Sequence, residues 1–280
     1  MSTNNNSAFL DEIRREALYR SCLVVDGNVR DVHNDGQGHY LPLPEVLMNH
    51  LAAMEYKGRP RFTICAHWDT ADGLRFLKPA MQQAFQQALK RSSVPAVSGR
   101  PSGSCPNNTC NGGSSNAPIP ANKGSSANAI FKQPEEALPA MRRVLASTIE
   151  RPVFILDWQE YLIGNPSQQD ANERQLLTIL GKAITAQPIC RTGLDVLEGP
   201  AGLLVIITSN LGKVPESLYK DNPRTKLITI HRPDRPQRLA FFTQNQRDLQ
   251  VADIKTEPGQ LPSRYGSLDD ATLRTYPNNP

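Results

Sequence analysis

Two long apolar runs in the second half of the chain constrain its fold more than any other feature. The runs VFIL (153–156) and LLVII (203–207) contain no polar residue, and each leads into polar side chains, Asp157 after the first and Ser209-Asn210 after the second. A strand that is apolar at every position is buried on both faces, as in a parallel sheet covered by helices. Ligands of open α/β sheets bind at the carboxyl ends of the strands. Asp157 and Asn210 are therefore the first candidate site residues.

Further strands and helices alternate around these two runs. Apolar spacing predicts strands at 22–25, 61–66 and 227–230, and helices at 8–19, 43–56, 74–90, 135–146 and 172–184. Strands that alternate with helices indicate a parallel sheet between two helical layers. We therefore expect a three-layer α/β fold with a five-stranded parallel sheet.

A stretch rich in serine, glycine, proline and asparagine interrupts this pattern between residues 92 and 133. It has almost nothing to bury, so we predict a flexible insert. The insert divides the α/β domain into a first half, 1–91, and a second half, 134–234. The remaining residues, 235–280, form a third segment, whose prolines interrupt any long helix.

Two groups of side chains have types that bind metal ions. Cys105 and Cys110 are spaced C-x4-C, but no second Cys/His pair lies nearby to complete a tetrahedral site. His67, Asp69 and Asp72 follow the second predicted strand without a further identifiable ligand. We interpret the first group as two exposed thiols and the second as a hydrogen-bonded loop.

Composition narrows the classes of partner. The 280 residues are 39% hydrophobic, which permits a sizeable core. Lysine and arginine number 31 against 27 acids and are scattered among them, so nucleic-acid binding is not indicated. No apolar run approaches the roughly 20 residues that span a bilayer, and the N-terminus lacks signal-peptide character. We expect a cytoplasmic protein without a membrane segment.

The candidate residues, in this order, resemble motifs of the AAA+ ATPases. Asp157 resembles the Walker B acid, and Asn210 resembles the sensor-1 asparagine. Arg224 matches the arginine-finger neighbourhood, and Pro233-Asp234 with Arg238 matches the turn and first helix of the lid. The resemblance therefore implies a small or incomplete helical lid and a tail over 235–280. The resemblance implies a P-loop NTPase-like fold in which the strands that precede Asp157 and Asn210 are neighbours, with the first strand next to the latter.

The same resemblance implies ligands and partners. ATP and magnesium are the implied ligands, with Asp157 holding the metal when nucleotide binds and Asn210 orienting the attacking water. Arg224 would point at a neighbouring subunit. A homo-oligomer or a partner AAA+ domain, together with a protein client, is therefore expected.

The loop after the first strand departs from the family. A P-loop needs G-x-x-x-x-G-K-[ST], so that backbone N–H groups and one lysine surround the phosphates. The sequence has DGNVRD at 26–31, where acids stand in place of the lysine and hydroxyl and would repel phosphate. Gly27, Asn28 and Arg30 are the residues that could contact a nucleotide there, with Arg30 as a bidentate phosphate ligand.

Three functions are compatible with the sequence. The favoured one is a non-catalytic AAA+-type module that contributes to the assembly of an ATP-driven protein-remodelling complex, since Trp158 also replaces the glutamate that activates water in the family. The second is an active AAA+ ATPase with an atypical phosphate loop around Arg30. The third is an unrelated α/β protein-interaction domain in which Asp157 caps a helix and Asn210 is a turn residue.

Overall fold

A six-stranded sheet forms the centre of the protein. The computed structural model describes residues 5–56, 58–93, 131–147, 149–157, 162, 169–188, 200–220 and 222–245. The sheet is built from β1 (Cys22–Gly27), β6 (Ile64–Asp69), β7 (Gly73–Phe76), β8 (Pro152–Leu156), β9 (Leu203–Ile207) and β10 (Thr225–Ile230). Its order is β10-β1-β9-β8-β6-β7, and every neighbouring pair except β6–β7 is parallel. The predicted α/β fold with a mostly parallel sheet is confirmed.

The order of the strands agrees with the AAA+ resemblance. β8, which precedes Asp157, pairs with β9, which precedes Asn210, and β1 pairs with the other edge of β9. Strands lying apart would have favoured an unrelated α/β domain. Their adjacency favours the arrangement expected from the family.

The prediction of only five strands is wrong, because β7 adds an antiparallel edge strand beside β6. The sequence placed a helix over 74–90, whereas α3 (Pro79–Ser93) begins after β7 ends. A strand of four residues is too short for its alternating pattern to be told from helical spacing. β6 also begins three residues later than the strand predicted at 61–66.

The turn between β6 and β7 is fixed by its own polar groups. The Asp69 carboxylate accepts hydrogen bonds from the backbone N–H groups of Ala71 at 2.8 Å and Asp72 at 2.7 Å. Gly73 follows with a φ of 76°, in the left-handed region that favours glycine. This turn reverses the chain directly beside the carboxyl end of β6.

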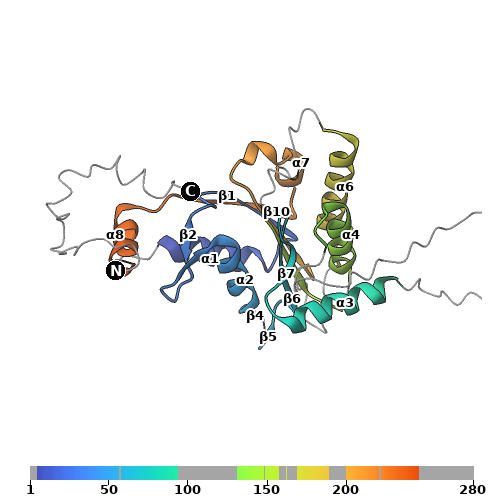
Figure 1. The fold of residues 1–280 in the computed structure, drawn as a ribbon, viewed down its shortest axis with the longest axis horizontal. Coiled ribbons are helices and arrows are strands. Elements are labelled where there is room, and N and C mark those ends of the chain that lie inside the picture. The colour runs from blue at the N-terminus through green and yellow to red at the C-terminus, as the bar shows by residue number, and fades with distance from the viewer. Residues whose placement is uncertain are drawn as a thin grey trace, which may run out of the picture.

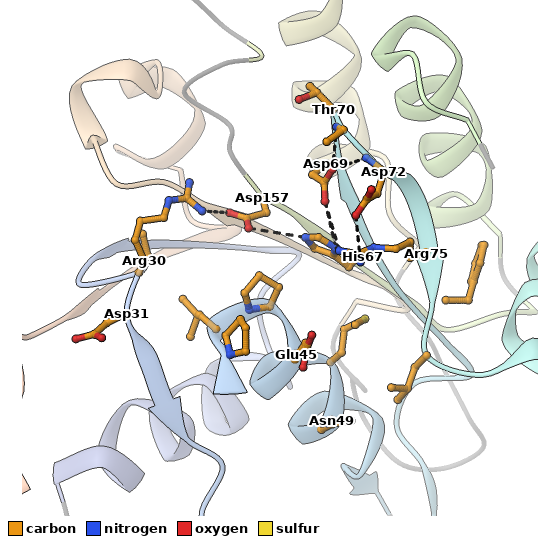
Figure 2. Close-up of a pocket in the computed structure, with 18 residues that line it drawn as sticks. Arg30, Asp31, Glu45, Asn49, His67, Asp69, Thr70, Asp72, Arg75 and Asp157 are labelled. Carbon is orange, nitrogen blue, oxygen red and sulfur yellow. Dashed lines mark hydrogen bonds and ion pairs between the residues drawn. The ribbon is translucent and has the colours of Figure 1, made fainter. Parts of the chain in front are cut away.

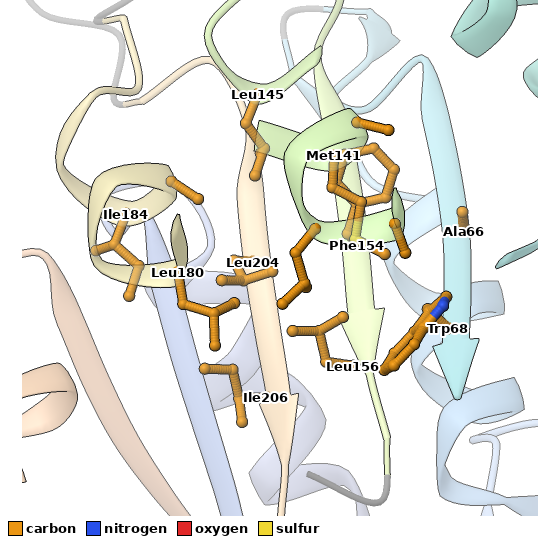
Figure 3. Packing of buried hydrophobic residues seen from close by; sticks show 14 of the residues in the cluster. Ala66, Trp68, Met141, Leu145, Phe154, Leu156, Leu180, Ile184, Leu204 and Ile206 are labelled. Atoms are coloured by element: carbon orange, nitrogen blue, oxygen red, sulfur yellow. The ribbon is translucent and has the colours of Figure 1, made fainter. Parts of the chain in front are cut away.

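Alternate residues of the central strands face opposite helical layers. On one face, Phe154 of β8 and Leu204 of β9 pack with α3, α4 (Pro134–Leu145) and α6 (Ala171–Thr185). On the other, Ile155 and Val205 pack with α1 (Asn5–Glu16) and α2 (Leu43–Ala52). Figure 1 shows the two layers, and Figure 3 shows the first cluster, with Ala66, Trp68, Met141, Leu145, Phe154, Leu156, Leu180, Ile184, Leu204 and Ile206 labelled.

Short elements connect these layers. They are β2 (Val32–Asn34) with β3 (Tyr40–Pro42), β4 (Glu55–Tyr56) with β5 (Arg59–Pro60), the 3-10 helix η1 (Leu211–Lys213), and α7 (Glu216–Tyr219). α8 (Arg235–Gln244) begins at Asp234 with a capping box and packs on the β2–β3 hairpin through an edge contact between the Tyr40 and Phe241 rings, at 4.7 Å (Figure 1). Its residues are those at which the resemblance implies the first lid helix, and its role as a lid stays a prediction.

Several sequence predictions lie outside the described residues. They include Trp158, the thiols Cys105 and Cys110, most of the insert, and the tail from 246 to 280. Within the described ranges, every helix is too short or too polar to cross a bilayer.

Phe131, the first described residue after α3, is held in place by two contacts. The Trp68 indole N–H donates to the Phe131 carbonyl oxygen at 2.9 Å. The Phe131 ring lies 6.3 Å from that of Phe85 on α3, edge to face. The entry into α4 is therefore fixed to the sheet at the end of β6.

Gly27 ends β1 where no other residue fits well. Its φ is 91°, and a Cβ atom there would overlap the backbone carbonyl of Ile230 on the adjacent β10. That carbonyl also accepts the N–H of Asn28 at 2.8 Å. The closest approach of β10 to the loop after β1 thus depends on glycine.

Replacing Gly27 with alanine should destabilise the protein. We expect Gly27→Ala to lower the free energy of unfolding by at least about 2 kcal/mol, because it combines backbone strain with a steric overlap. Gly181→Ala in α6 is the matched control: no atom lies near its Cβ position, so helix propensity should raise stability by about 0.5–1 kcal/mol. Urea unfolding measures both; equal effects would contradict this account.

One buried and one half-buried histidine lie around the α1–α2 layer. His33 on β2 is 4% exposed and contacts the ring of Phe9. Burial lowers the pKa of His33, and burial together with the charge of Arg14 lowers the pKa of His50 on α2. Both side chains therefore favour the neutral form in the folded protein.

The stability of the protein should fall in mild acid. A histidine whose pKa is lower in the folded than in the unfolded state stabilises the fold above the unfolded value of about 6.5, and this contribution is lost as the pH falls below it. Urea unfolding between about pH 7.5 and pH 5 measures the loss. His50→Gln should flatten the dependence; identical profiles for wild type and His50→Gln would refute the explanation.

Candidate functional site

A cleft of about 820 Å³ opens at the carboxyl ends of β6 and β8 (Figure 2). The loop after β1, the start of α2, the β6–β7 hairpin and the end of β8 form its walls. Its lining residues are Val29, Arg30, Asp31, Pro42, Leu43, Pro44, Glu45, Met48, Asn49, His67, Asp69, Thr70, Ala71, Asp72, Arg75, Phe76, Leu77 and Asp157.

An ion pair between Arg30 and Asp157 closes one end of the cleft. The Arg30 Nη1 atom lies 2.5 Å from Asp157 Oδ1, and the two side chains are 26% and 6% exposed. The Asp157 backbone N–H donates to the carbonyl of Trp68 at 3.0 Å. Because β9 lies between β1 and β8, Arg30 reaches across the tip of the intervening strand to make this pair.

His67 lies on the other side of the Asp157 carboxylate, as Figure 2 shows. Its Nε2 atom is 3.9 Å from Asp157 Oδ2, and its Nδ1 atom is 3.1 Å from Arg75 Nη2. A guanidinium group can only donate, so Nδ1 accepts and the ring proton of neutral His67 is on Nε2. That N–H is buried and lacks a hydrogen-bond partner in the described structure.

Arg75 links His67 to two further carboxylates. Its guanidinium lies 3.5 Å from Asp69 Oδ2 and 3.2 Å from Asp72 Oδ2. These contacts account for the polar cluster that the sequence singled out after the second strand. The sequence did not indicate that His67 faces Asp157, or that Arg75 belongs to the group. No three potential metal ligands of the described residues are grouped closely enough to hold an ion.

Asn210 ends the neighbouring strand but lies outside the cleft lining. Its Oδ1 atom accepts the N–H of Gly212 at 3.0 Å, which caps η1. Its own N–H donates to Thr208 Oγ1 at 3.1 Å. The contacts of Asn210 are those of a turn residue, while its strand position is that of the sensor-1 asparagine.

Arg224 lies at the amino end of the edge strand β10, whereas Asp157 follows the carboxyl end of β8, with β1 and β9 between these two strands. The Arg224 carbonyl accepts the N–H groups of Ser21 and Cys22 at the start of β1. Its guanidinium donates to the Thr185 carbonyl at 2.8 Å at the protein surface. The structure therefore does not bring Arg224 into the cleft.

Gly27 and Asn28, the other predicted nucleotide contacts, lie beside the cleft without lining it. The Asn28 side chain donates to Asp31 Oδ2 at 3.2 Å. Of the three residues predicted to contact a nucleotide, only Arg30 lines the cleft, where its guanidinium binds Asp157.

A double-mutant cycle should detect the Arg30–Asp157 pair. Arg30→Met leaves a buried carboxylate without this cation, so we expect it to lower the free energy of unfolding by about 1–3 kcal/mol. The double variant Arg30→Met/Asp157→Asn should lower the free energy of unfolding by less than the sum of the two single variants. The exposed pair Lys220–Glu216 is the control, with coupling too small to detect. Additive losses at Arg30 and Asp157 would show that the pair adds no stability.

The model of the AAA+ chaperone N-terminal Rossmann-like domain matches residues 3–231. No curated protein and no solved structure matches the chain. The match covers the whole sheet, from α1 to the end of β10. The chain therefore belongs to the family of AAA+ chaperone N-terminal Rossmann-like domains.

Proposed function

We propose that this domain is a non-catalytic AAA+-type module that helps to assemble an ATP-driven protein-remodelling complex. The Arg30–Asp157 ion pair carries the proposal. In catalytic family members the carboxylate at the position of Asp157 is expected to hold magnesium. Here that carboxylate binds a guanidinium of the same chain, so the donor set does not fit magnesium and a triphosphate.

The start of α2 supports the same conclusion. In a P-loop protein, the helix after the first strand presents free N–H groups to phosphate. Here the β2–β3 hairpin intervenes, and α2 begins after Pro42. Pro44 has no N–H to donate, and Glu45 adds a negative charge to the first turn. A phosphate at this helix end would meet fewer donors and a repelling carboxylate.

The alternative of an ATPase that uses Arg30 as its phosphate ligand is less well supported. Phosphate would have to compete with Asp157 for the same guanidinium, and release of Arg30 would leave the buried Asp157 carboxylate without this cation. Both steps oppose nucleotide binding.

A non-catalytic module of this kind would act by assembling with other subunits or domains. We expect a partner AAA+ domain with an intact phosphate loop, or a homo-oligomer, to act with it in the cytoplasm on a protein client. Arg224 remains a predicted contact with a neighbouring subunit, since its hydrogen bond to Thr185 leaves it at the surface. Asn210 would then keep its strand position without a catalytic task.

Nucleotide titration tests the proposal. Isothermal titration of the purified chain with ATP and magnesium should give no binding, and phosphate release should stay at the buffer rate. Asp157→Asn removes the carboxylate that holds Arg30 and is the informative variant: weak magnesium-independent ATP binding by this variant alone would agree with a site closed by the ion pair. Micromolar, magnesium-dependent binding by the wild type, abolished by Arg30→Ala, would overturn the proposal.

A further inference from the structure

The cleft carries more negative than positive charge. Five carboxylates line it, against two guanidinium groups. Arg30 pairs with Asp157, and Arg75 pairs with Asp69 and Asp72. The remaining two carboxylates are those of Asp31 and Glu45.

These two carboxylates are not neutralised within the described part of the chain. Asp31 accepts hydrogen bonds from the Asn28 side chain and from the Val32 N–H, but it has no cationic partner there. Glu45 is exposed at the first turn of α2, and no hydrogen bond or ion pair to it occurs among the described residues. The cleft wall formed by the loop after β1 and the start of α2 therefore attracts a cation.

His67 supplies a second, independent indication of a ligand. The side chain is 3% exposed and lines the cleft, with its Nε2–H beyond hydrogen-bond distance of any described acceptor. An orphaned buried donor is unfavourable unless something accepts from it. A metal ion or a simple polyamine has no acceptor to offer. A peptide carbonyl oxygen, directly or through one water molecule, does.

Apolar side chains between the charges point to the same class of ligand. Val29, Leu43, Met48, Phe76 and Leu77 line the cleft beside the carboxylates. Its volume of about 820 Å³ falls in the range of about 300–1,000 Å³ that is typical of ligand pockets. We infer that the cleft binds a segment of a partner protein that carries a lysine or arginine next to an apolar side chain. This goes beyond the proposed function, because it does not depend on how the chain assembles.

Fluorescence anisotropy with the full chain tests the inference. The probe is a fluorescein-labelled peptide, Ala-Leu-Arg-Leu-Arg-Ala, and its counterpart has citrulline in place of both arginines. We expect the arginine peptide to bind and the citrulline peptide to bind at least about fivefold more weakly. Glu45→Gln and Asp31→Asn should each weaken arginine-peptide binding about three- to fivefold.

Glu55→Gln is the matched control, because Glu55 is an exposed carboxylate on β4 that does not line the cleft. It should leave the affinity unchanged, and circular dichroism should show that all variants are folded. No binding by the wild type, equal binding of the two peptides, or equal affinities of Glu45→Gln and Glu55→Gln would overturn the inference. Displacement of the peptide by spermidine as effectively as by unlabelled peptide would also overturn it, by assigning the cleft to small polycations. None of these results affects the nucleotide titration, so the two proposals fail separately.

Discussion

The ion pair between Arg30 and Asp157 connects the two halves of the candidate site. It links the loop after β1 to the tip of β8 across the intervening β9, so it fixes the wall of the cleft as well as the charge at its end. The Asp157 carboxylate is buried and would be unfavourable without a cation. One arginine thus satisfies a buried acid and occupies the place where the family resemblance implies magnesium. The shape and the expected inactivity of the site have the same cause.

The strands were predictable wherever burial on both faces leaves a continuous apolar run. β8 and β9 were predicted to within one residue at each end, and their adjacency was implied by the resemblance to the AAA+ ATPases. β7 was missed because it lies at the sheet edge and its formation depends on a turn built by Asp69 and Gly73. Short edge strands depend on such tertiary and turn contacts, which periodicity does not encode.

The site was predictable only in part. The sequence identified Asp157 and Arg30 separately, from a strand end and from a loop that lacks a lysine, but not as partners. Their contact depends on strand order, which places residues far apart in the chain at the same edge of the sheet. Glu45 and Arg75 gave no signal, because a first-turn acid and an edge-strand arginine are common surface residues. Glu45 and Arg75 could have been proposed as site residues only once the topology showed which helix starts and strand ends meet at the cleft.

The anchoring of Phe131 has a consequence for how sequences of this kind can diverge. The Trp68 indole and the Phe85 ring hold the point at which the chain returns to the sheet, independently of the residues from 94 to 130. For a flexible insert of the kind that the sequence predicts here, the entropy of loop closure grows only with the logarithm of the length, so doubling it would change stability by only about 0.6 kcal/mol. Insertions and deletions between α3 and α4 should therefore accumulate in related chains, while the residues at both junctions stay in register.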